Sequence, residues 1–342
     1  MNPAATLTAN LIRETMRNSK VLFIAGVPGA RFLVQAASLL LALTLVFLST
    51  THAANAGKSG KRFASPEEAV AALRLATAAA DTNALRDVLG PGAEDLENPD
   101  RIQAGTELKT FSSALAETNH LVHVSDTRAI LEVGDDLWPF PVPIVKNDGG
   151  WFFDTDAGKD ELLSRRIGKN ELSILQVMRA YVDAQREYAS SDRDGDGVLE
   201  FAQRLVSSPG NQDGLYWPSD FDGDESPFGP LVAYAQIEGY SPELRDENEV
   251  ERGPFHGYYF KILSRQGKHA PGGKYDYVIN GNMIGGFAMV AWPAEYSSSG
   301  VMTFIVNQQG RVYQKDLGSK TLKLATKMKA YDPDPSWILS PD

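Results

Sequence analysis

A ten-residue stretch, DRDGDGVLEF at positions 192–201, places acidic side chains at alternate positions. Its three aspartates match the first, third and fifth ligand positions of an EF-hand-type calcium loop, and Gly197 matches the sixth, where such loops need glycine. An acidic residue also occupies the ninth position. The stretch therefore predicts a Ca²⁺ site. The predicted metal ligands are Asp192, Asp194, Asp196 and Glu200.

The twelfth position of this loop departs from the calcium pattern. An EF-hand carries a bidentate Glu there, whereas this chain has Gln203, which offers one neutral oxygen and should lower the affinity. Flexible, oxygen-rich loops suit Ca²⁺ better than Mg²⁺. The alternative interpretation is that the Asp and Gly residues only form a solvated turn after a helix.

Other polar clusters give weaker signals. The stretch SDFDGDES at 219–226 is acidic, but Glu225 stands where glycine is needed when the count starts at Asp220, so a solvated loop is expected. His120 and His123 lie three positions apart in a predicted strand, and this odd offset directs them to opposite faces and makes them a poor metal pair.

No catalytic residues are predicted. The chain has no cysteine, which excludes thiol catalysis and disulfides, and it has no HExxH, GxSxG or Walker sequence. Glu251, His256 and Asp276 could form a hydrolytic set only if the fold brought them together, and nothing in their spacing supports this. The tryptophans and several tyrosines could line a cleft but are expected mainly in the core.

The elements that must position the Asp-rich loop follow from caps, turns and periodicity. Ser65-Pro66-Glu67-Glu68 predicts a capped helix start. Apolar residues at steps of three and four predict a long helix from Gly158 to Ser190, with a break near Gly168. Further helices are predicted over 82–90, 101–118 and 199–207, with a short one in the tail. Strands are predicted over 120–125, 128–134, 137–146 and 149–156, and again from 255 to 318. The segment 208–255 is predicted to be rich in loops.

The N-terminal segment indicates export. Arg31 precedes the apolar run FLVQAASLLLALTLVFL at 32–48, and small residues follow it, so residues 1–56 are predicted to be a signal peptide or, alternatively, an uncleaved membrane anchor. The formal charge is −11, and residues 1–56 carry four basic residues and one acidic residue, so the exported part is still more acidic. Such a charge disfavours binding to nucleic acid.

Several long stretches carry a resemblance to a family. WPFPVPIVK (138–146), GWFFDTDAGKDELLSRRIGKNEL (150–172), FHGYYFKIL (255–263) and GFAMVAWPAEYSSSGVMTFIVN (286–307) look like the DUF2950 family of uncharacterised exported bacterial proteins. The C-terminal half also resembles the heads of type IV pilin-like proteins and pseudopilins. The order of helices and strands before it resembles NTF2-like domains. About 120 residues separate the apolar N-terminal segment from the predicted head helix, unlike in pilins.

These observations predict an α+β fold: N-terminal helices on a curved antiparallel sheet, a long helix, then a head with an antiparallel β-meander. The predicted domains are a linker at 57–64, an NTF2-like domain at 65–168 and a pilin-like domain at 169–342. The expected function is a non-enzymatic binding or assembly accessory of the cell envelope, periplasmic or secreted, with an envelope or secretion-associated protein as partner. The alternatives are a periplasmic hydrolase with a site at the domain interface and a small-ligand carrier that uses a pocket of the first domain.

Overall fold

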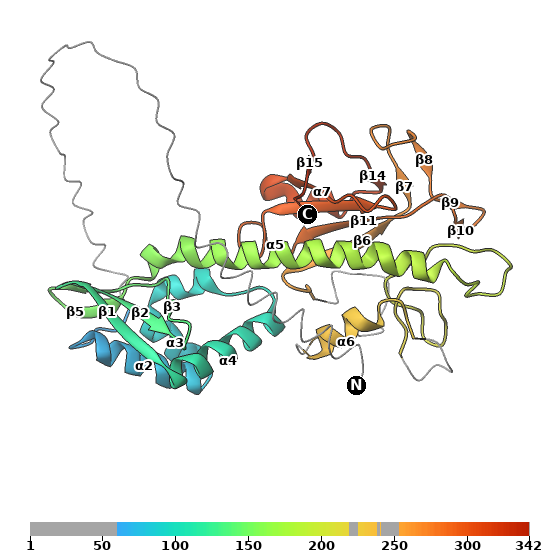
Figure 1. Cartoon of the computed structure of the whole chain (residues 1–342). Helices are drawn as coiled ribbons and strands as arrows, with labels where there is room; N and C mark the ends of the chain where they lie inside the picture. Colours follow the sequence, from blue (N-terminus) through green and yellow to red (C-terminus); the bar gives the residue numbers. More distant parts are fainter. Residues whose placement is uncertain (1–59, 219–224, 238–239, 241–252, 342) are drawn as a thin grey trace, which may run out of the picture. The chain divides into compact units, whose positions relative to one another are not determined.

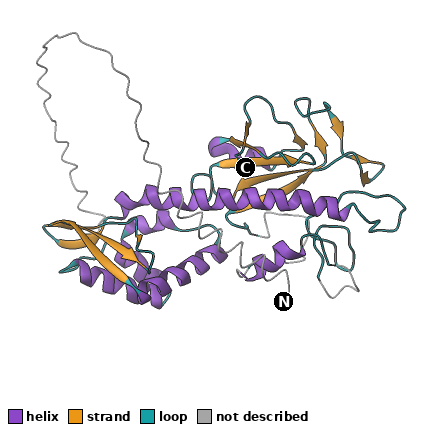
Figure 2. Cartoon of the chain, in the orientation of Figure 1, coloured by secondary structure: helices purple, strands orange, loops and turns teal. Residues whose placement is uncertain are grey.

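The chain folds into helices and several antiparallel sheets, so the predicted α+β class is confirmed (Figures 1 and 2). The computed structural model describes residues 60–218, 225–237, 240 and 253–341, which all belong to one compact unit. Three predictions lie outside the described residues: the signal segment, the aspartates of the second acidic cluster, and Glu251. No helix in the described part of the chain is long and apolar enough to cross a membrane.

The N-terminal helices begin at polar caps. Ser65 accepts a hydrogen bond from the Glu68 N–H, and the Glu68 carboxylate accepts the Ala64 N–H, which confirms the predicted helix start. Asp81 and Asp100 cap the next two α-helices in the same way. The helices are α2 (Pro66–Ala78), α3 (Thr82–Leu89), the 3₁₀ helix η1 (Pro91–Leu96) and α4 (Arg101–Glu117).

A sheet follows these helices, with strand order β1-β2-β4-β5 and a short strand β3 beside β2, all antiparallel. Helices and sheet enclose a core in which Leu73, Leu115 and Leu131 are fully buried. The strands are β1 (Asn119–Ser125), β2 (Arg128–Val133), β3 (Trp138–Pro139), β4 (Ile144–Asn147) and β5 (Gly150–Phe153).

The helix α5 (Thr155–Tyr188) runs for 34 residues without interruption, so the predicted break near Gly168 is wrong (Figure 1). A glycine inside a helix costs about 1 kcal/mol relative to Ala, which packing elsewhere along the helix readily offsets. The N-terminal part of α5 contacts η1, and its C-terminal part buries a stripe in the second core. That stripe includes Ile174, Met178, Tyr181 and Tyr188, at the spacing of three and four residues that predicted the helix.

The second core lies between α5 and a five-stranded sheet with strand order β15-β13-β12-β11-β6. The hairpin β9–β10 and the three strands β14-β7-β8 extend this half. The elements are α6 (Gly229–Ile237), β6 (Tyr258–Leu263), β7 (Arg265–Gln266), β8 (Tyr275–Asp276), β9 (Val278–Ile279), β10 (Asn282–Met283), β11 (Ala288–Pro293), β12 (Met302–Asn307), β13 (Tyr313–Asp316), η3 (Gly318–Lys320), α7 (Thr321–Ala325), β14 (Ala330–Tyr331) and β15 (Ile338–Leu339).

Two local predictions in this half are wrong. The segment 199–207 is not helical, because distant groups take its backbone hydrogen bonds: the Phe201 N–H donates to Met283, and the Ala202 N–H donates to the Gln185 side chain. Conversely, α6 lies in the segment predicted to be loop. Most of the singled-out aromatics are core residues, as expected, and fully buried examples are Trp217, Tyr258 and Trp292.

Candidate metal site in the Asp192–Glu200 loop

The Asp-rich loop begins just after α5 ends and curls around the carboxylate of its first aspartate. The two oxygens of Asp192 accept the N–H groups of Gly195 (2.8 Å) and Gly197 (2.9 Å). Both glycines have positive φ, +78° and +84°, a region that other residues enter only with strain. The two glycines in the sequence are therefore required by the way the loop closes.

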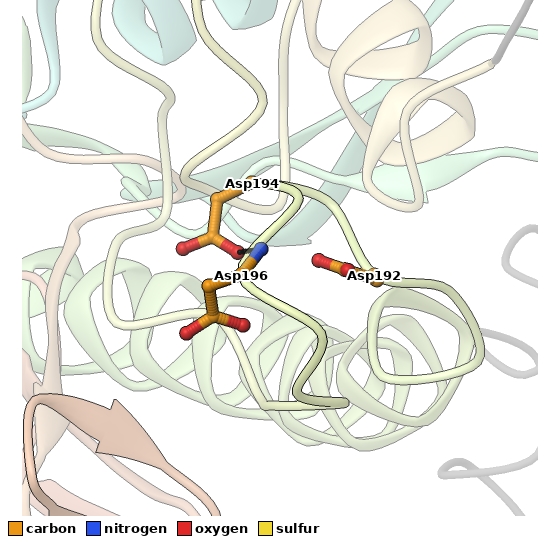
Figure 3. Close-up of side chains that lie close together, drawn as sticks. All are labelled: Asp192, Asp194 and Asp196. Atoms are coloured by element: carbon orange, nitrogen blue, oxygen red, sulfur yellow. Dashed lines mark hydrogen bonds between the residues drawn. The ribbon is translucent and has the colours of Figure 1, made fainter.

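The loop brings three of the four predicted ligands together (Figure 3). One carboxylate oxygen from each of Asp192, Asp194 and Asp196 lies within 4.8 Å of the others, and all three side chains are exposed. The backbone N–H of Asp196 donates to Asp194 (3.3 Å), and Asp196 in turn accepts the Val198 N–H (2.7 Å). The resulting cluster of oxygens is the donor type that Ca²⁺ and Mg²⁺ bind.

The hydrogen bonds from the loop backbone also fix the charge of the first aspartate. The N–H groups of Gly197 and Gly195 hold the pKa of Asp192 below its usual value, because they stabilise the ionised carboxylate. Asp192 is thus a carboxylate at neutral pH. Three negative charges in so small a space repel one another, and a divalent cation would remove that repulsion.

The residue between the first two aspartates points the other way and anchors the loop. The Arg193 guanidinium lies over the Trp217 ring at 5.3 Å from its centroid and over the Tyr188 ring at 6.0 Å. Burial raises the pKa of Tyr188 to about 12, and its hydroxyl donates to the Gln212 carbonyl (2.9 Å). The aspartate side chains of the loop are therefore exposed to solvent, whereas the Arg193 side chain between them contacts aromatic rings of the second core.

A hairpin distant in sequence packs against the loop. Asn280 and Gly281 have positive φ and form the turn between β9 and β10. The next residue, Asn282, donates its side-chain amide to Asp196 at 2.6 Å. Asn282 is not among the ligands that the sequence predicts. The Asn-Gly dipeptide signals the hairpin, but no pattern indicates which loop the hairpin meets.

Glu200 and Gln203 both form hydrogen bonds with the β9–β10 hairpin. Glu200 lies outside the carboxylate cluster, and its Oε2 accepts the backbone N–H of Met283 (2.9 Å). The amide of Gln203 donates to the Gly281 carbonyl (2.6 Å). The residues at the ninth and twelfth positions of the calcium pattern, Glu200 and Gln203, therefore form hydrogen bonds that hold the β9–β10 hairpin.

The residues considered for hydrolysis are not assembled in the described part of the chain. Asp276 pairs with Arg265 at 3.3 Å, whereas His256 is buried and its ring stacks on Tyr240 with 5.9 Å between centroids. A cavity beside His256 and Tyr240 measures about 30 Å³. This volume holds about one water molecule, far less than a substrate pocket.

A groove on the N-terminal half is the candidate pocket for a small-ligand carrier, and His120 and His123 line it. It measures about 330 Å³ and is lined by Glu67 and Val70 of α2 and by four residues of β1: Asn119, His120, Leu121 and His123. It is shallow and largely polar, unlike an enclosed apolar cavity. His123 lies 3.8 Å from Glu67, and His120 and His123 belong to no group of three metal-ligating side chains among the described residues.

Comparison with known proteins identifies the family. A family model described as "Protein of unknown function (DUF2950)" matches residues 60–339. No curated protein and no solved structure matches the chain. The match includes both cores, the whole of α5 and the Asp-rich loop, and it confirms the resemblance to the DUF2950 family. The chain therefore belongs to the DUF2950 family.

Proposed function

We propose that this protein is an exported, non-enzymatic binding or assembly accessory of the cell envelope, and that Ca²⁺ bound at the Asp-rich loop steadies its C-terminal half. The observation that carries the calcium proposal is the convergence of Asp192, Asp194 and Asp196 within 4.8 Å. These three provide the inner ligands. Glu200 acts through a bridging water, as the ninth EF-hand position often does.

The position of the loop gives the ion a structural role. The loop joins the end of α5 to Phe201, and Asp196 and Glu200 both hold the β9–β10 hairpin. A cation there would fix the aspartates and, through them, the contact between helix and hairpin. Because Gln203 is engaged with Gly281, the site lacks a bidentate twelfth ligand. We therefore expect an affinity of about 10⁻⁴–10⁻³ M, the range of extracellular calcium modules.

Location and fold relationships belong to the same proposal. The signal sequence at 1–56 would deliver the protein to the periplasm or the exterior, where calcium at this affinity is useful. We regard residues 65–168 as an NTF2-like domain and residues 169–342 as a pilin-like domain. Element order supports both assignments: three helices precede an antiparallel sheet, and a long helix packs on antiparallel strands. The partner we expect is an envelope or secretion-associated protein.

A calcium titration of thermal stability tests the proposal. A ligand that binds only the folded state raises the melting temperature as its concentration passes Kd. We expect the melting temperature to rise with Ca²⁺ and to rise less with Mg²⁺. Addition of EDTA should return it to the value measured without calcium. No shift in Ca²⁺ up to about 10 mM, well above the expected Kd, would overturn the calcium proposal.

A further inference from the structure

The segment 318–329 is a short helical stretch whose leucines point away from the core. It comprises η3, α7 and the turn that follows α7. Thr321 and Ala325, one turn apart, are buried, and α7 packs against β11 of the C-terminal sheet (Figure 1). Leu322 and Leu324, by contrast, are 50% and 47% exposed. Small side chains therefore attach α7 to the sheet, and its large apolar side chains stay outside the core.

Lysines flank these leucines along the segment, and all of them are exposed. They form no ion pair within the described part of the chain, whereas Lys159 and Lys169 on α5 pair with Asp95 at 2.6 Å and with Glu107 at 2.9 Å. We call the surface that the lysines and leucines form the α7 patch. It consists of Lys320, Leu322, Lys323, Leu324, Lys327 and Lys329.

The acidic residues that flank the α7 patch in sequence are engaged with other groups. Asp316 accepts the Gly318 N–H at 2.7 Å and the Tyr296 hydroxyl at 3.2 Å. Asp332 accepts the backbone N–H of His269 at 2.8 Å and lies 3.1 Å from its ring nitrogen. No acidic residue stands between them in the sequence. The patch is therefore a concentration of positive charge in a chain whose net charge is −11.

We propose that the α7 patch binds the surface of a membrane that contains anionic lipids. Clusters of about four to eight basic residues bind the phosphate groups of such surfaces. Lys323 and Lys327 are four positions apart, which places them on the same side of the helical stretch. The leucines beside them can enter the boundary between headgroups and acyl chains, where their exposed apolar surface leaves water.

The mixture of lysine and leucine selects a membrane among anionic partners. Nucleic acid is bound by basic surfaces together with side chains that read or stack on bases, and the patch contains no aromatic residue. An acidic protein surface matches the lysines alone. A bilayer interface provides phosphates and, about 5–10 Å deeper, an apolar layer for the leucines, so it matches both features.

The acidity of the rest of the chain gives this contact a direction. Charges more than about 8–10 Å apart are largely screened at physiological salt, so the lysines of the patch decide the attraction at close range. The acidic remainder of the chain is repelled by the same anionic surface. The protein would therefore lie on the membrane with α7 toward the lipid.

This inference rests on the export in the proposed function, because export brings the protein beside a membrane. It does not rest on calcium, since no residue of the α7 patch belongs to the Asp-rich loop. Calcium can bridge carboxylates and lipid phosphates, so lipid binding has to be measured in EDTA. A failure of the calcium proposal then leaves lipid binding unchanged, and a failure of lipid binding leaves the calcium-dependent melting shift unchanged.

Vesicle co-sedimentation tests the inference on the protein purified after export through its own N-terminal segment. The probes are vesicles of phosphatidylcholine alone and vesicles in which about a third of the lipid is phosphatidylglycerol. In EDTA we expect binding to the phosphatidylglycerol vesicles and little binding to phosphatidylcholine. We also expect the binding to weaken as salt rises, because screening reduces the attraction of the lysines.

Matched variants locate the contact. The double variant Lys323→Gln/Lys327→Gln should weaken binding by about tenfold or more, since each lysine near an anionic surface adds to the attraction. The control Lys109→Gln/Lys146→Gln removes the same charge from exposed positions of the N-terminal half and should leave binding unchanged. Leu322→Ser should weaken binding by about threefold or more, whereas Leu172→Ser, at an exposed position on α5, should not.

Four outcomes would overturn the inference. They are equal binding to both kinds of vesicle, no binding to either, equal losses in the two lysine double variants, and binding to polyglutamate as tight as to the phosphatidylglycerol vesicles. The last would show that the patch recognises negative charge alone. Because all the substituted side chains are exposed, their melting temperatures should match that of the wild type, which makes the binding losses interpretable.

Discussion

At the scale of single residues, the Asp-rich loop divides its acidic groups between two tasks. Asp192 uses both oxygens to close the loop on Gly195 and Gly197, whereas the hydrogen bond that Asp194 accepts from the next aspartate is long, at 3.3 Å. The first aspartate is therefore needed for the shape of the loop. Asp194 can be changed with the least effect on that shape, which makes it the better probe of metal binding.

The first prediction uses this difference. Asp194→Asn removes one of three charges from the cluster and keeps the size of the side chain. We expect the calcium affinity to fall by about tenfold, because ligand charge sets the affinity of such loops. Calorimetric titration measures it. Asp148→Asn, at the exposed turn between β4 and β5, is the control, and an equal loss in both variants would contradict a local site.

The second prediction concerns pH. The folded pKa of Asp192 is lowered by the Gly197 and Gly195 N–H groups. Its contribution to stability is therefore fully present above the unfolded-state pKa of about 3.9 and is lost as pH falls through the lower folded value. In urea unfolding without calcium, we expect the wild type to lose more stability below about pH 4 than Asp192→Asn does. Equal acid sensitivity in the two proteins would contradict the role assigned to these hydrogen bonds.

At the scale of elements, α5 connects the two cores, and its two glycines, Gly158 in the first turn and Gly168 further along, have different environments. A Cβ at Gly158 would lie 2.6 Å from the Val142 Cα and 2.7 Å from the Pro141 carbonyl oxygen. A Cβ at Gly168 would meet nothing within 4 Å. Gly158 is thus required by close packing against the segment before β4, whereas Gly168 has no steric role.

The third prediction follows from this pair. Gly168→Ala should stabilise the protein by about 0.5–1 kcal/mol, since alanine has the higher helix propensity and the site has room. Gly158→Ala should destabilise it by about 1–3 kcal/mol, the usual cost of overpacking. Chemical denaturation of both variants gives the comparison. A loss of stability in Gly168→Ala would show that the helix needs flexibility at the position where a break was predicted.

At the scale of the whole molecule, buried polar groups join the N-terminal helices to the C-terminal half. Asp100, 1% exposed, accepts the Gln103 N–H and the Gly257 N–H, both at 3.0 Å, and the Tyr240 hydroxyl at 2.6 Å. Asn170 on α5 accepts from the Gln103 side chain (2.7 Å) and donates to the Ser299 carbonyl (2.9 Å). Both residues are buried and connect segments far apart in sequence.

The fourth prediction tests this connection. Asn170→Ala leaves the Gln103 amide and the Ser299 carbonyl buried without their partner, at a cost of about 1–3 kcal/mol for each unsatisfied group. We expect a lower melting temperature and a broader transition in calorimetry, because the two cores lose a shared contact. Asn211→Ala, at an exposed position, is the control. A transition of unchanged width would show that other contacts couple the cores.

The sequence by itself determined the features that depend on near neighbours. The Ser65 cap and the periodic core stripe of α5 were both predicted, because caps and periodic burial involve residues a few positions apart. The α+β class follows from them. The aspartates that converge were also predicted, since their alternation lies within one loop.

The tertiary structure alone decided which distant groups meet. The segment 199–207 is not helical because two of its N–H groups pair with Gln185 and Met283, and α5 passes through Gly168 because two cores hold it. The contact of Asn282 with Asp196 spans 86 positions, and that of Asp100 with Gly257 spans 157. No local pattern encodes such contacts, because they depend on how the packed elements bring the chain back on itself.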